Sequence, residues 1–248
     1  MPTEEPDRSG PGAGRFHSTR WENVLAARDS ADPQAGMALA ELCRTYWYPL
    51  YAFCRRKGCT PEQAEDWTQG FFSDGLARGF LRTVDPARGR FRSFLLAAFE
   101  NYVGKQHARE TRVKRGGRVA IVPLDGQGAE ARYLREPTHV ETAERLYVRR
   151  WALTMLDRAL DRLERRMTGK GSAPLFDRLK PALLGAEDAV GYAGVAKELG
   201  MSEGAVKVAA HRIRARLGAL IREEVAQTVA DPSQIDDEIR DLFSALGS

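Results

Sequence analysis

Apolar residues recur every three or four positions in two stretches of the N-terminal half, 37–54 and 91–103. This spacing lines up apolar side chains on one face of a helix, so both stretches are predicted to be amphipathic helices. Pro49 lies inside the first stretch and is expected to kink or split its helix. Between the two, Thr60 is placed to cap a third helix that begins at Pro61, with a glutamine where a capping box needs one.

The C-terminal half shows the same helical spacing. A heptad-like row of Leu and Met at 146–167 predicts a long helix packed against others, with a coiled-coil dimer as the alternative. Further helices are expected at 172–184, in two pieces within 192–229, and at 232–246 after Asp231 as the cap. The chain has 34 Ala and 24 Leu against 14 Val and 5 Ile, which favours helices because β-branched side chains lose rotamer freedom in them. The predicted fold class is all-α.

Glycine, proline and charge divide the chain into predicted units. Residues 1–15 are rich in Gly, Pro and acidic residues and are expected to form a disordered tail. A second Gly- and Pro-rich stretch, 116–138, is interpreted as a flexible linker. Two helical domains result, 16–115 and 139–230, followed by a helical extension at 231–248. The chain shows no run of roughly 20 apolar residues that could span a membrane and no signal-peptide pattern, so a cytoplasmic protein is expected.

Charge and cysteine content narrow the function classes. The chain has 38 basic and 34 acidic residues, and most of the basic ones are Arg, which suits phosphate recognition but follows equally from a GC-rich genome. The chain has three cysteines, an odd number: Cys43, Cys54 and Cys59. They form no paired motif and have no His near them in the sequence, so we expect reduced, buried thiols and no metal site. Paired carboxylates, a nucleophile elbow and a Gly-rich phosphate loop are all missing from the sequence. We therefore expect no enzyme activity, no cofactor and no small-molecule substrate.

Residues 192–217 have the pattern of a helix-turn-helix. Such a unit needs a small residue where its helices touch, a glycine in the turn and an aliphatic anchor in the second helix, and Ala196, Gly200 and Val206 stand at these positions. The second helix would then turn basic residues outward, as entry into a DNA major groove requires. The alternative is an ordinary helical hairpin with a solvated basic face.

The aromatic residues of the 91–103 stripe have two interpretations. They could stack on unpaired bases, but their regular spacing favours a role in the core. Contacts to a nucleic-acid strand are therefore assigned to the opposite face and the basic C-terminal end of the same helix.

Four motifs, taken in chain order, resemble one protein family. They are Tyr48-Pro49-Leu50-Tyr51, then Pro61-Glu62-Gln63-Ala64-Glu65-Asp66-Trp67-Thr68-Gln69-Gly70-Phe71-Phe72, then Arg90-Phe91-Arg92-Ser93-Phe94-Leu95 with Asn101, and last Leu199-Gly200-Met201-Ser202-Glu203-Gly204-Ala205-Val206-Lys207 continued by His211-Arg212-Ile213-Arg214. This order resembles the two-domain layout of bacterial RNA polymerase sigma factors of the extracytoplasmic-function (ECF) type, in the sigma-70 superfamily. The chain departs from the usual pattern at Trp67, where a smaller aliphatic residue is usual, and at Gly70, where Glu is common.

The resemblance implies a sigma factor that recruits core RNA polymerase to promoters and recognises their minus-ten and minus-thirty-five elements. The first domain would dock on the clamp helices of the largest polymerase subunit through Asp66, Gln69 and Phe72. The second domain would contact the flap of the second subunit. Strand contacts at the minus-ten element are assigned to Arg92, Asn101, Lys105, Arg109 and Arg112. Duplex contacts of the helix-turn-helix are assigned to Ser202, Glu203, Lys207, His211, Arg212 and Arg214.

The expected partners are thus core RNA polymerase and promoter DNA, with an anti-sigma factor as a further partner. Two other functions fit the same residues. One is a helix-turn-helix regulator that binds duplex DNA as a dimer and uses its N-terminal half for sensing or interaction. The other is a degenerate sigma-like adaptor that binds protein only.

Overall fold

The computed structural model describes residues 35–78, 90–112, 128–136, 142–169, 171–183, 191–229 and 231–247. Every regular element in these ranges is helical, so the predicted all-α class is confirmed. The elements are α2 (Ala35–Arg56), α3 (Pro61–Arg78), α4 (Phe91–Arg112), α5 (Ala129–Tyr133), α6 (Ala143–Thr168), α7 (Ala173–Leu183), α8 (Tyr192–Leu199), α9 (Glu203–Ala226), η4 (Pro232–Gln234) and α10 (Ile235–Leu246). The predicted tail at 1–15 and most of the predicted linker lie outside the described residues.

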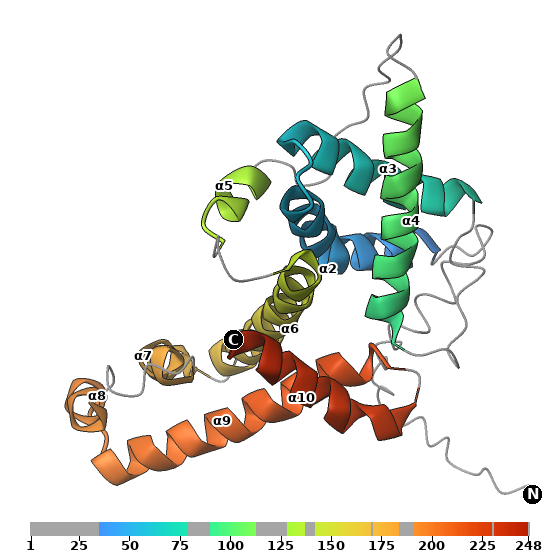
Figure 1. The fold of residues 1–248 in the computed structure, drawn as a ribbon. Coiled ribbons are helices and arrows are strands. Elements are labelled where there is room, and N and C mark those ends of the chain that lie inside the picture. The colour runs from blue at the N-terminus through green and yellow to red at the C-terminus, as the bar shows by residue number, and fades with distance from the viewer. Residues whose placement is uncertain are drawn as a thin grey trace, which may run out of the picture.

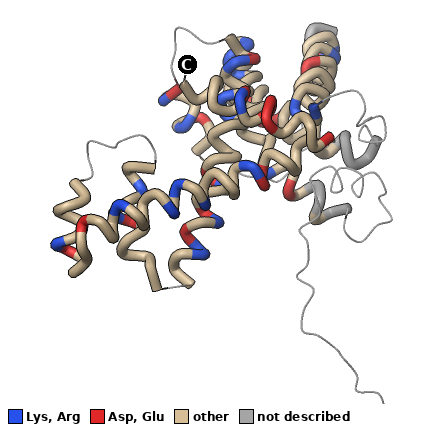
Figure 2. Tube along the Cα trace, turned by 90° about the horizontal axis from the view of Figure 1, so that it is seen from below, with Lys and Arg blue, Asp and Glu red and all other residues tan. Residues whose placement is uncertain are grey.

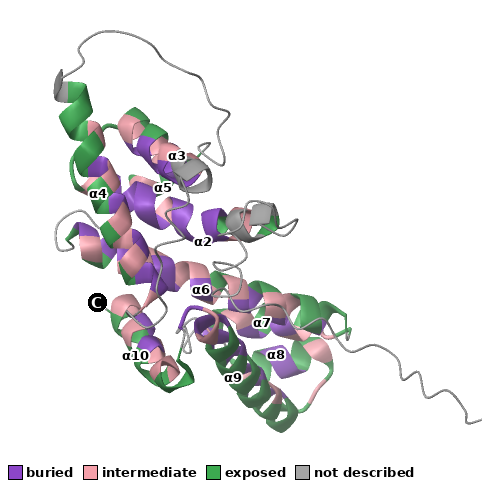
Figure 3. Ribbon diagram, turned by 90° about the vertical axis from the view of Figure 1, so that its right-hand side faces the viewer, coloured by how far each residue is buried: buried purple, intermediate pink, exposed green. Residues whose placement is uncertain are grey.

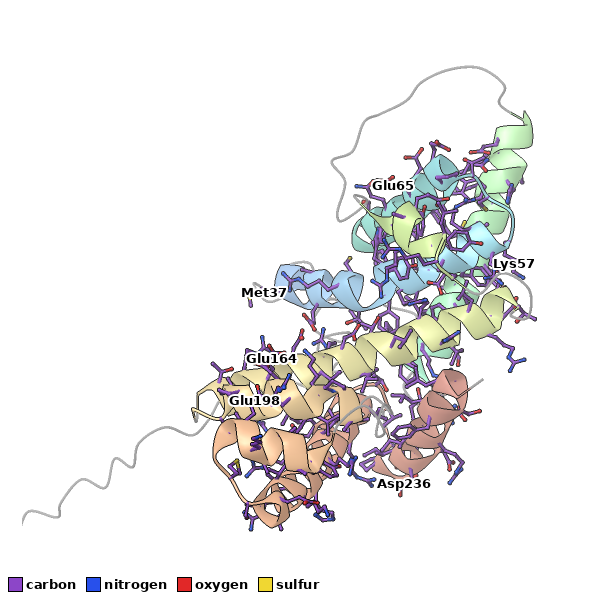
Figure 4. The ribbon with its side chains drawn as sticks, turned by 90° about the vertical axis from the view of Figure 1, so that its left-hand side faces the viewer. Met37, Lys57, Glu65, Glu164, Glu198 and Asp236 are labelled. Atoms are coloured by element: carbon purple, nitrogen blue, oxygen red, sulfur yellow. The ribbon has the colours of Figure 1, made fainter. Side chains whose placement is uncertain are left out.

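Helix α6 is the central element of the fold (Figure 1). The helices α2, α3, α4 and α5 lie around its N-terminal part, and α7, α8 and α9 lie around its C-terminal part. Helix α10 lies beside the N-terminal half of α6, against the start of α4 (Figure 4). The most extensive helix contacts in the described ranges join α6 to α2, α9 and α10. Buried apolar residues on both sides of the predicted linker belong to one cluster, so the core is continuous across it.

The central position of α6 explains why its buried face is wider than the predicted heptad row (Figure 3). Leu146, Leu160 and Leu163 of that row are buried, as expected, but the row does not include Trp151 and Met155, which are also completely buried. A helix that contacts neighbours on several sides buries more than one stripe. Packing within one chain therefore accounts for the apolar row of α6.

The boundary between α2 and α3 follows the local sequence closely. Helix α2 continues through Pro49 without splitting and ends at Arg56. Two residues later, Gly58 has a φ of 93°, in the left-handed region that favours glycine after a helix end. At the start of α3, the Thr60 hydroxyl accepts from the Gln63 backbone N–H (3.2 Å), and the Gln63 side chain accepts from the Thr60 N–H (3.1 Å). The predicted capping box is thereby confirmed.

Helix α4 packs its aromatic stripe into the core. The Phe99 ring meets Phe53 and Phe71 edge-on, with centroids 6.2 and 5.2 Å away. This arrangement confirms the core interpretation of the aromatic residues. The buried apolar positions of α4 recur every four residues: Phe91, Leu95, Phe99 and Val103.

Residues 128–136, expected to belong to a flexible linker, instead form α5 and a turn that pack against α2. Glu130 pairs with Arg55 of α2 at 2.7 Å, and the buried Glu136 accepts a hydrogen bond of 2.8 Å from the Tyr48 hydroxyl. The linker prediction is wrong here because a helix of five residues leaves no periodic signal. The segment is held instead by contacts with residues far away in the chain, such as the Arg55–Glu130 ion pair across 75 positions.

A buried ion-pair network joins α4 to α10. Arg92, which is 6% exposed, donates from Nε and Nη2 to the two carboxylate oxygens of Glu238 at 2.6 and 3.0 Å, and from Nη2 to Asp241 at 2.9 Å. Arg90 pairs with the same two carboxylates. The Arg92 guanidinium also lies over the Trp151 ring of α6, 4.9 Å from its centroid. Two positive and two negative charges thus neutralise one another where three helices meet.

Arginines of α6 make a second set of bridges. Arg158 and Arg162 both pair with the buried Glu224 of α9, at 3.1 and 2.8 Å, and Arg158 also pairs with Glu41 of α2. At the other end of α6, Lys57, which directly follows α2 and is labelled in Figure 4, pairs with Glu144 at 2.7 Å. Charged contacts therefore hold α6 to its neighbours at both ends.

Replacing Arg92 by Ala should lower the free energy of unfolding by about 3–5 kcal/mol, because Glu238 then keeps a buried charge without its main partner. Urea denaturation measures the effect. The matched control is Arg240→Ala, which removes an exposed pair with Asp237 and should cost less than about 1 kcal/mol. The double variant Arg92→Leu/Glu238→Leu should recover much of the loss, because it leaves no unpaired buried charge. Equal effects of Arg92→Ala and Arg240→Ala would contradict a structural role for this network.

Candidate nucleic-acid interface

Helices α8 and α9 are joined by a short turn built as its sequence predicts. Gly200 ends α8 in the left-handed conformation, with φ of 65°, and the Met201 N–H donates to the Ala196 carbonyl at 2.9 Å. Ser202 has extended backbone angles, and its hydroxyl accepts from the Ala205 N–H at 3.2 Å. The first turn of α9 is therefore capped by a small side chain that leaves it open to solvent.

The two helices pack through small and branched residues. Val195 and Ala196 of α8 are buried, as is one face of α9 formed by Val206, Ala210 and Ile213. Ala196 and Val206 are contact positions that the sequence predicts, and the buried residues of α9 recur at three- and four-residue steps. The opposite side of α9 faces solvent (Figure 3).

The exposed side of α9 carries a mainly positive charge. From Glu203 to Arg216 the helix has four basic residues and one acidic residue. Five of the six residues assigned to duplex contact are exposed, and the sixth, Arg214, is half-buried with its Nη2 3.5 Å from the Tyr192 hydroxyl. Arg216, which was not assigned, is exposed as well. We call the exposed set the α9 face: Ser202, Glu203, Lys207, His211, Arg212 and Arg216. Across the molecule, Lys and Arg are spread over many helices (Figure 2). Charge alone therefore does not distinguish the α9 face, which is also set apart by its exposure and its place at the start of a capped helix.

One basic residue of the α9 face already has an acidic partner. Lys207 pairs with Glu203 one turn earlier at 2.7 Å, and both side chains are about half exposed. The hydrogen bond that the Lys207 ammonium donates to the Glu203 carboxylate raises the pKa of Lys207. Glu203 suits the positive end of the helix dipole, but it also repels phosphate and holds the Lys207 ammonium. A polyanion that contacts Lys207 has to compete with this carboxylate.

The outer end of α4 forms a second basic surface. Asn101, Lys105 and Arg109 are all exposed there, as predicted. In Figure 1 this end of α4 projects away from α6. The side chain of Arg112 lies outside the described residues.

The assignment of Arg92 to strand contact is corrected by the structure. The residue lies at the inner end of α4, under α10, with its guanidinium occupied by Glu238 and Asp241. A helical pattern identifies the face of α4 that packs against its own half of the chain, but it gives no sign that a later helix will cover the opposite face. Arg92 is therefore a structural residue in this conformation.

The proposed docking residues of α3 also divide into two groups. Asp66 is exposed, whereas Gln69 and Phe72 are only 8% and 4% exposed. The three residues assigned to docking therefore do not share one exposed face, because α3 packs against both α2 and α4 and this double contact covers positions on either side of its apolar stripe. Only Asp66 of the three is available at the surface.

Both departures from the family pattern lie where α3 meets α4. The Trp67 ring packs edge-on against His107 of α4, with centroids 4.4 Å apart. A Cβ atom at Gly70 would come within 2.5 Å of the Tyr102 hydroxyl oxygen, so a side chain there would displace Tyr102. The unusual residues of α3 are thus matched by aromatic residues of α4.

The carboxylates that neutralise Arg92 were not predicted, although the sequence contains a signal for one of them. Glu238 lies three positions after Ile235 and four before Leu242, on the apolar face of α10. A carboxylate at such a position is stable only with a buried cationic partner. The pattern could have predicted that α10 packs against an arginine, but it could not have identified which one.

No cluster of potential metal ligands occurs among the residues that the structure describes. Within the same ranges, no helix has the length and apolar character needed to cross a membrane. Comparison of the chain with known protein families, with curated proteins and with solved structures finds no match.

Replacing Glu203 by Gln should strengthen binding of the chain to duplex DNA, because it frees Lys207 and removes a negative charge from the α9 face. The plot of log affinity against log salt should also steepen, by up to about one unit if Lys207 then neutralises one more phosphate. Fluorescence anisotropy with a labelled duplex at several salt concentrations measures both quantities. Asp237→Asn is the matched control, since Asp237 is an exposed acidic residue of α10 paired with Arg240. An equal gain in both variants would show that only net charge matters.

Proposed function

We propose that this chain is a sigma-type transcription initiation factor whose α8 and α9 form a helix-turn-helix that binds promoter DNA. The observation that carries the proposal is the α9 face, an exposed cationic surface at the start of a capped helix whose opposite side is buried. The order of the four family-like motifs supports the assignment to initiation factors.

The α9 face has the properties that major-groove binding requires. Residues near the start of a recognition helix contact base edges, while flanking residues contact phosphates. Lys207 and His211 lie one turn apart on this face and are proposed to contact bases. Arg212 and Arg216 are proposed to contact the DNA backbone. This contact would correspond to the minus-thirty-five element.

The outer end of α4 is proposed to contact the minus-ten strand. Asn101, Lys105 and Arg109 supply an amide and two cations on one projecting helix end. These groups suit the backbone and base edges of a single strand, and aromatic stacking is not available because the aromatic side chains of α4 pack into the core. Strand contact in this proposal is therefore polar and salt-sensitive.

Polymerase docking is proposed to use the exposed side of α3. Asp66 lies there together with Glu62, which is also exposed. An acidic surface of this kind is complementary to basic residues on a partner protein. Asp66→Arg should weaken the complex with core polymerase on size exclusion without changing the melting curve of the chain alone.

A second candidate is a regulator that binds duplex DNA without polymerase. The burial of Gln69, Phe72 and Arg92 favours it, because three of the residues assigned to polymerase and strand contact are inaccessible in this conformation. The two functions differ in one measurement. A sigma-type factor forms a one-to-one complex with core polymerase and supports run-off transcription from a genomic library, whereas a regulator does neither.

Lys207→Ala and His211→Ala should each relax the preference at one or two upstream base pairs by about 1–3 kcal/mol. Arg216→Ala should weaken binding to all sequences alike, because phosphate contacts carry no sequence information. Selection of promoter variants against the parent and each variant in parallel provides the comparison. If Lys207→Ala and His211→Ala both return the parental consensus with equal stringency, the α9 face does not determine sequence preference.

A further inference from the structure

Two of the three cysteines meet at the end of α2. The Gly58 N–H donates to the Arg55 carbonyl at 3.0 Å and the Cys59 N–H to the Cys54 carbonyl at 3.2 Å, with Gly58 in the left-handed conformation. These two hydrogen bonds define a Schellman motif. The motif brings the side chains at its first and last positions together, and the residues at these positions are usually apolar.

In this chain both positions of the cap are cysteines. The Cys54 thiol donates to the Cys59 sulfur, and the two sulfurs are 3.1 Å apart. Both residues are reduced and buried, with exposures of 0% and 2%. The hydrogen bonds of the cap fix the backbone on either side of the pair. The two thiols are therefore held in contact by local structure and do not depend on distant packing.

The surroundings of the pair make the two sulfurs chemically unequal. A hydrogen bond from Cys54, a second one from His107 of α4 and the charge of Arg55 hold the pKa of Cys59 below its usual range. The same hydrogen bond, together with burial, raises the pKa of Cys54. Arg55 also donates to the Cys59 carbonyl, and Trp67 of α3 packs on the His107 ring. One sulfur is thus favoured as a thiolate and its neighbour as a thiol.

Cys43 provides an internal comparison. It lies on α2 as well, but burial raises the pKa of its thiol to about 12. A thiol is oxidised through its thiolate, so Cys43 is inert at neutral pH although it belongs to the same helix.

We propose that Cys54 and Cys59 form a redox-active dithiol that a hydroperoxide converts into an intramolecular disulfide. The Cys59 thiolate attacks the peroxide, so that an S–O bond forms, the O–O bond breaks and hydroxide leaves. The Cys54 sulfur then attacks the sulfenic acid on Cys59, the S–S bond forms, and water leaves with the Cys54 proton. Hydroxide takes up the proton that Cys59 released when it ionised. Two thiols lose two electrons and hydrogen peroxide is reduced to two molecules of water.

The position of the pair determines how an oxidant reaches it and what its oxidation changes in the structure. Gly58 and Thr60, which flank Cys59, are exposed, so fraying of the cap by one turn admits a small oxidant. The disulfide would fix the end of α2 and remove the thiolate that His107 faces. Oxidation of the pair therefore changes the contact between α4 and the end of α2, whatever molecule α4 binds. The dithiol is formed by the cap and by His107 of α4, and it is independent of the proposed function.

The test uses the full chain treated with hydrogen peroxide, denatured, alkylated and analysed by mass spectrometry. The expected product has lost two hydrogens, contains a Cys54–Cys59 cross-link that dithiothreitol reverses, and keeps Cys43 as its one alkylated cysteine. Cys43→Ala should behave in the same way, with no thiol left to alkylate. Cys59→Ala should form no intramolecular disulfide. Retention of three thiols by the parent, or a cross-link through Cys43, would overturn the proposal.

The rate of disulfide formation tests the role of His107. His107→Ala should slow the reaction several-fold at pH 7 and much less at pH 9, where Cys59 ionises without help. A matched melting curve shows whether the cap is intact in the variant. Equal rates for parent and variant at both pH values would overturn the activation of Cys59 by His107.

Discussion

A guanidinium removed from water has to be neutralised where it lies, and the carboxylates that neutralise Arg92 come from the far end of the chain. Glu238 and Asp241 hold α10 against the start of α4, and the Trp151 ring of α6 completes the contact. Because unpaired buried charges are strongly unfavourable, the positions of α4, α6 and α10 depend on one another. The bridges from Arg158 and Arg162 to Glu224 extend this dependence to α9.

This arrangement separates residues that maintain the fold from residues that are available to a partner. The inner end of α4 is fixed by ion pairs, while its outer end carries Asn101, Lys105 and Arg109 in solvent. Helix α9 is divided in the same way, since its C-terminal part is tied to α6 through Glu224 and its N-terminal part presents the α9 face. Each candidate contact surface therefore stands on a helix that is anchored at its other end.

The sequence predicted those features that local chemistry decides. The capping box at Thr60, the glycine turn at Gly200 and the helical class all follow from neighbours within a few positions. The places of Gln69 and Arg92 could not be predicted, because what covers them comes from other helices. Apolar periodicity shows that a helix has a buried face, but not whether a second helix will cover the other one. The position of Glu238 on an apolar helix face indicates that it has a buried cationic partner. It does not indicate which residue that partner is.

The separation of Arg92 and Glu238 by 146 positions also bears on how the protein is made. A ribosome adds about 5–20 residues per second, so Arg92 is synthesised roughly 7 to 30 seconds before the carboxylate that neutralises it. During that interval α2, α3 and α4 can pack their aromatic core, but the start of α4 must keep its arginines in water. The carboxylates of α10 are thus the groups that allow the arginines at the start of α4 to leave water.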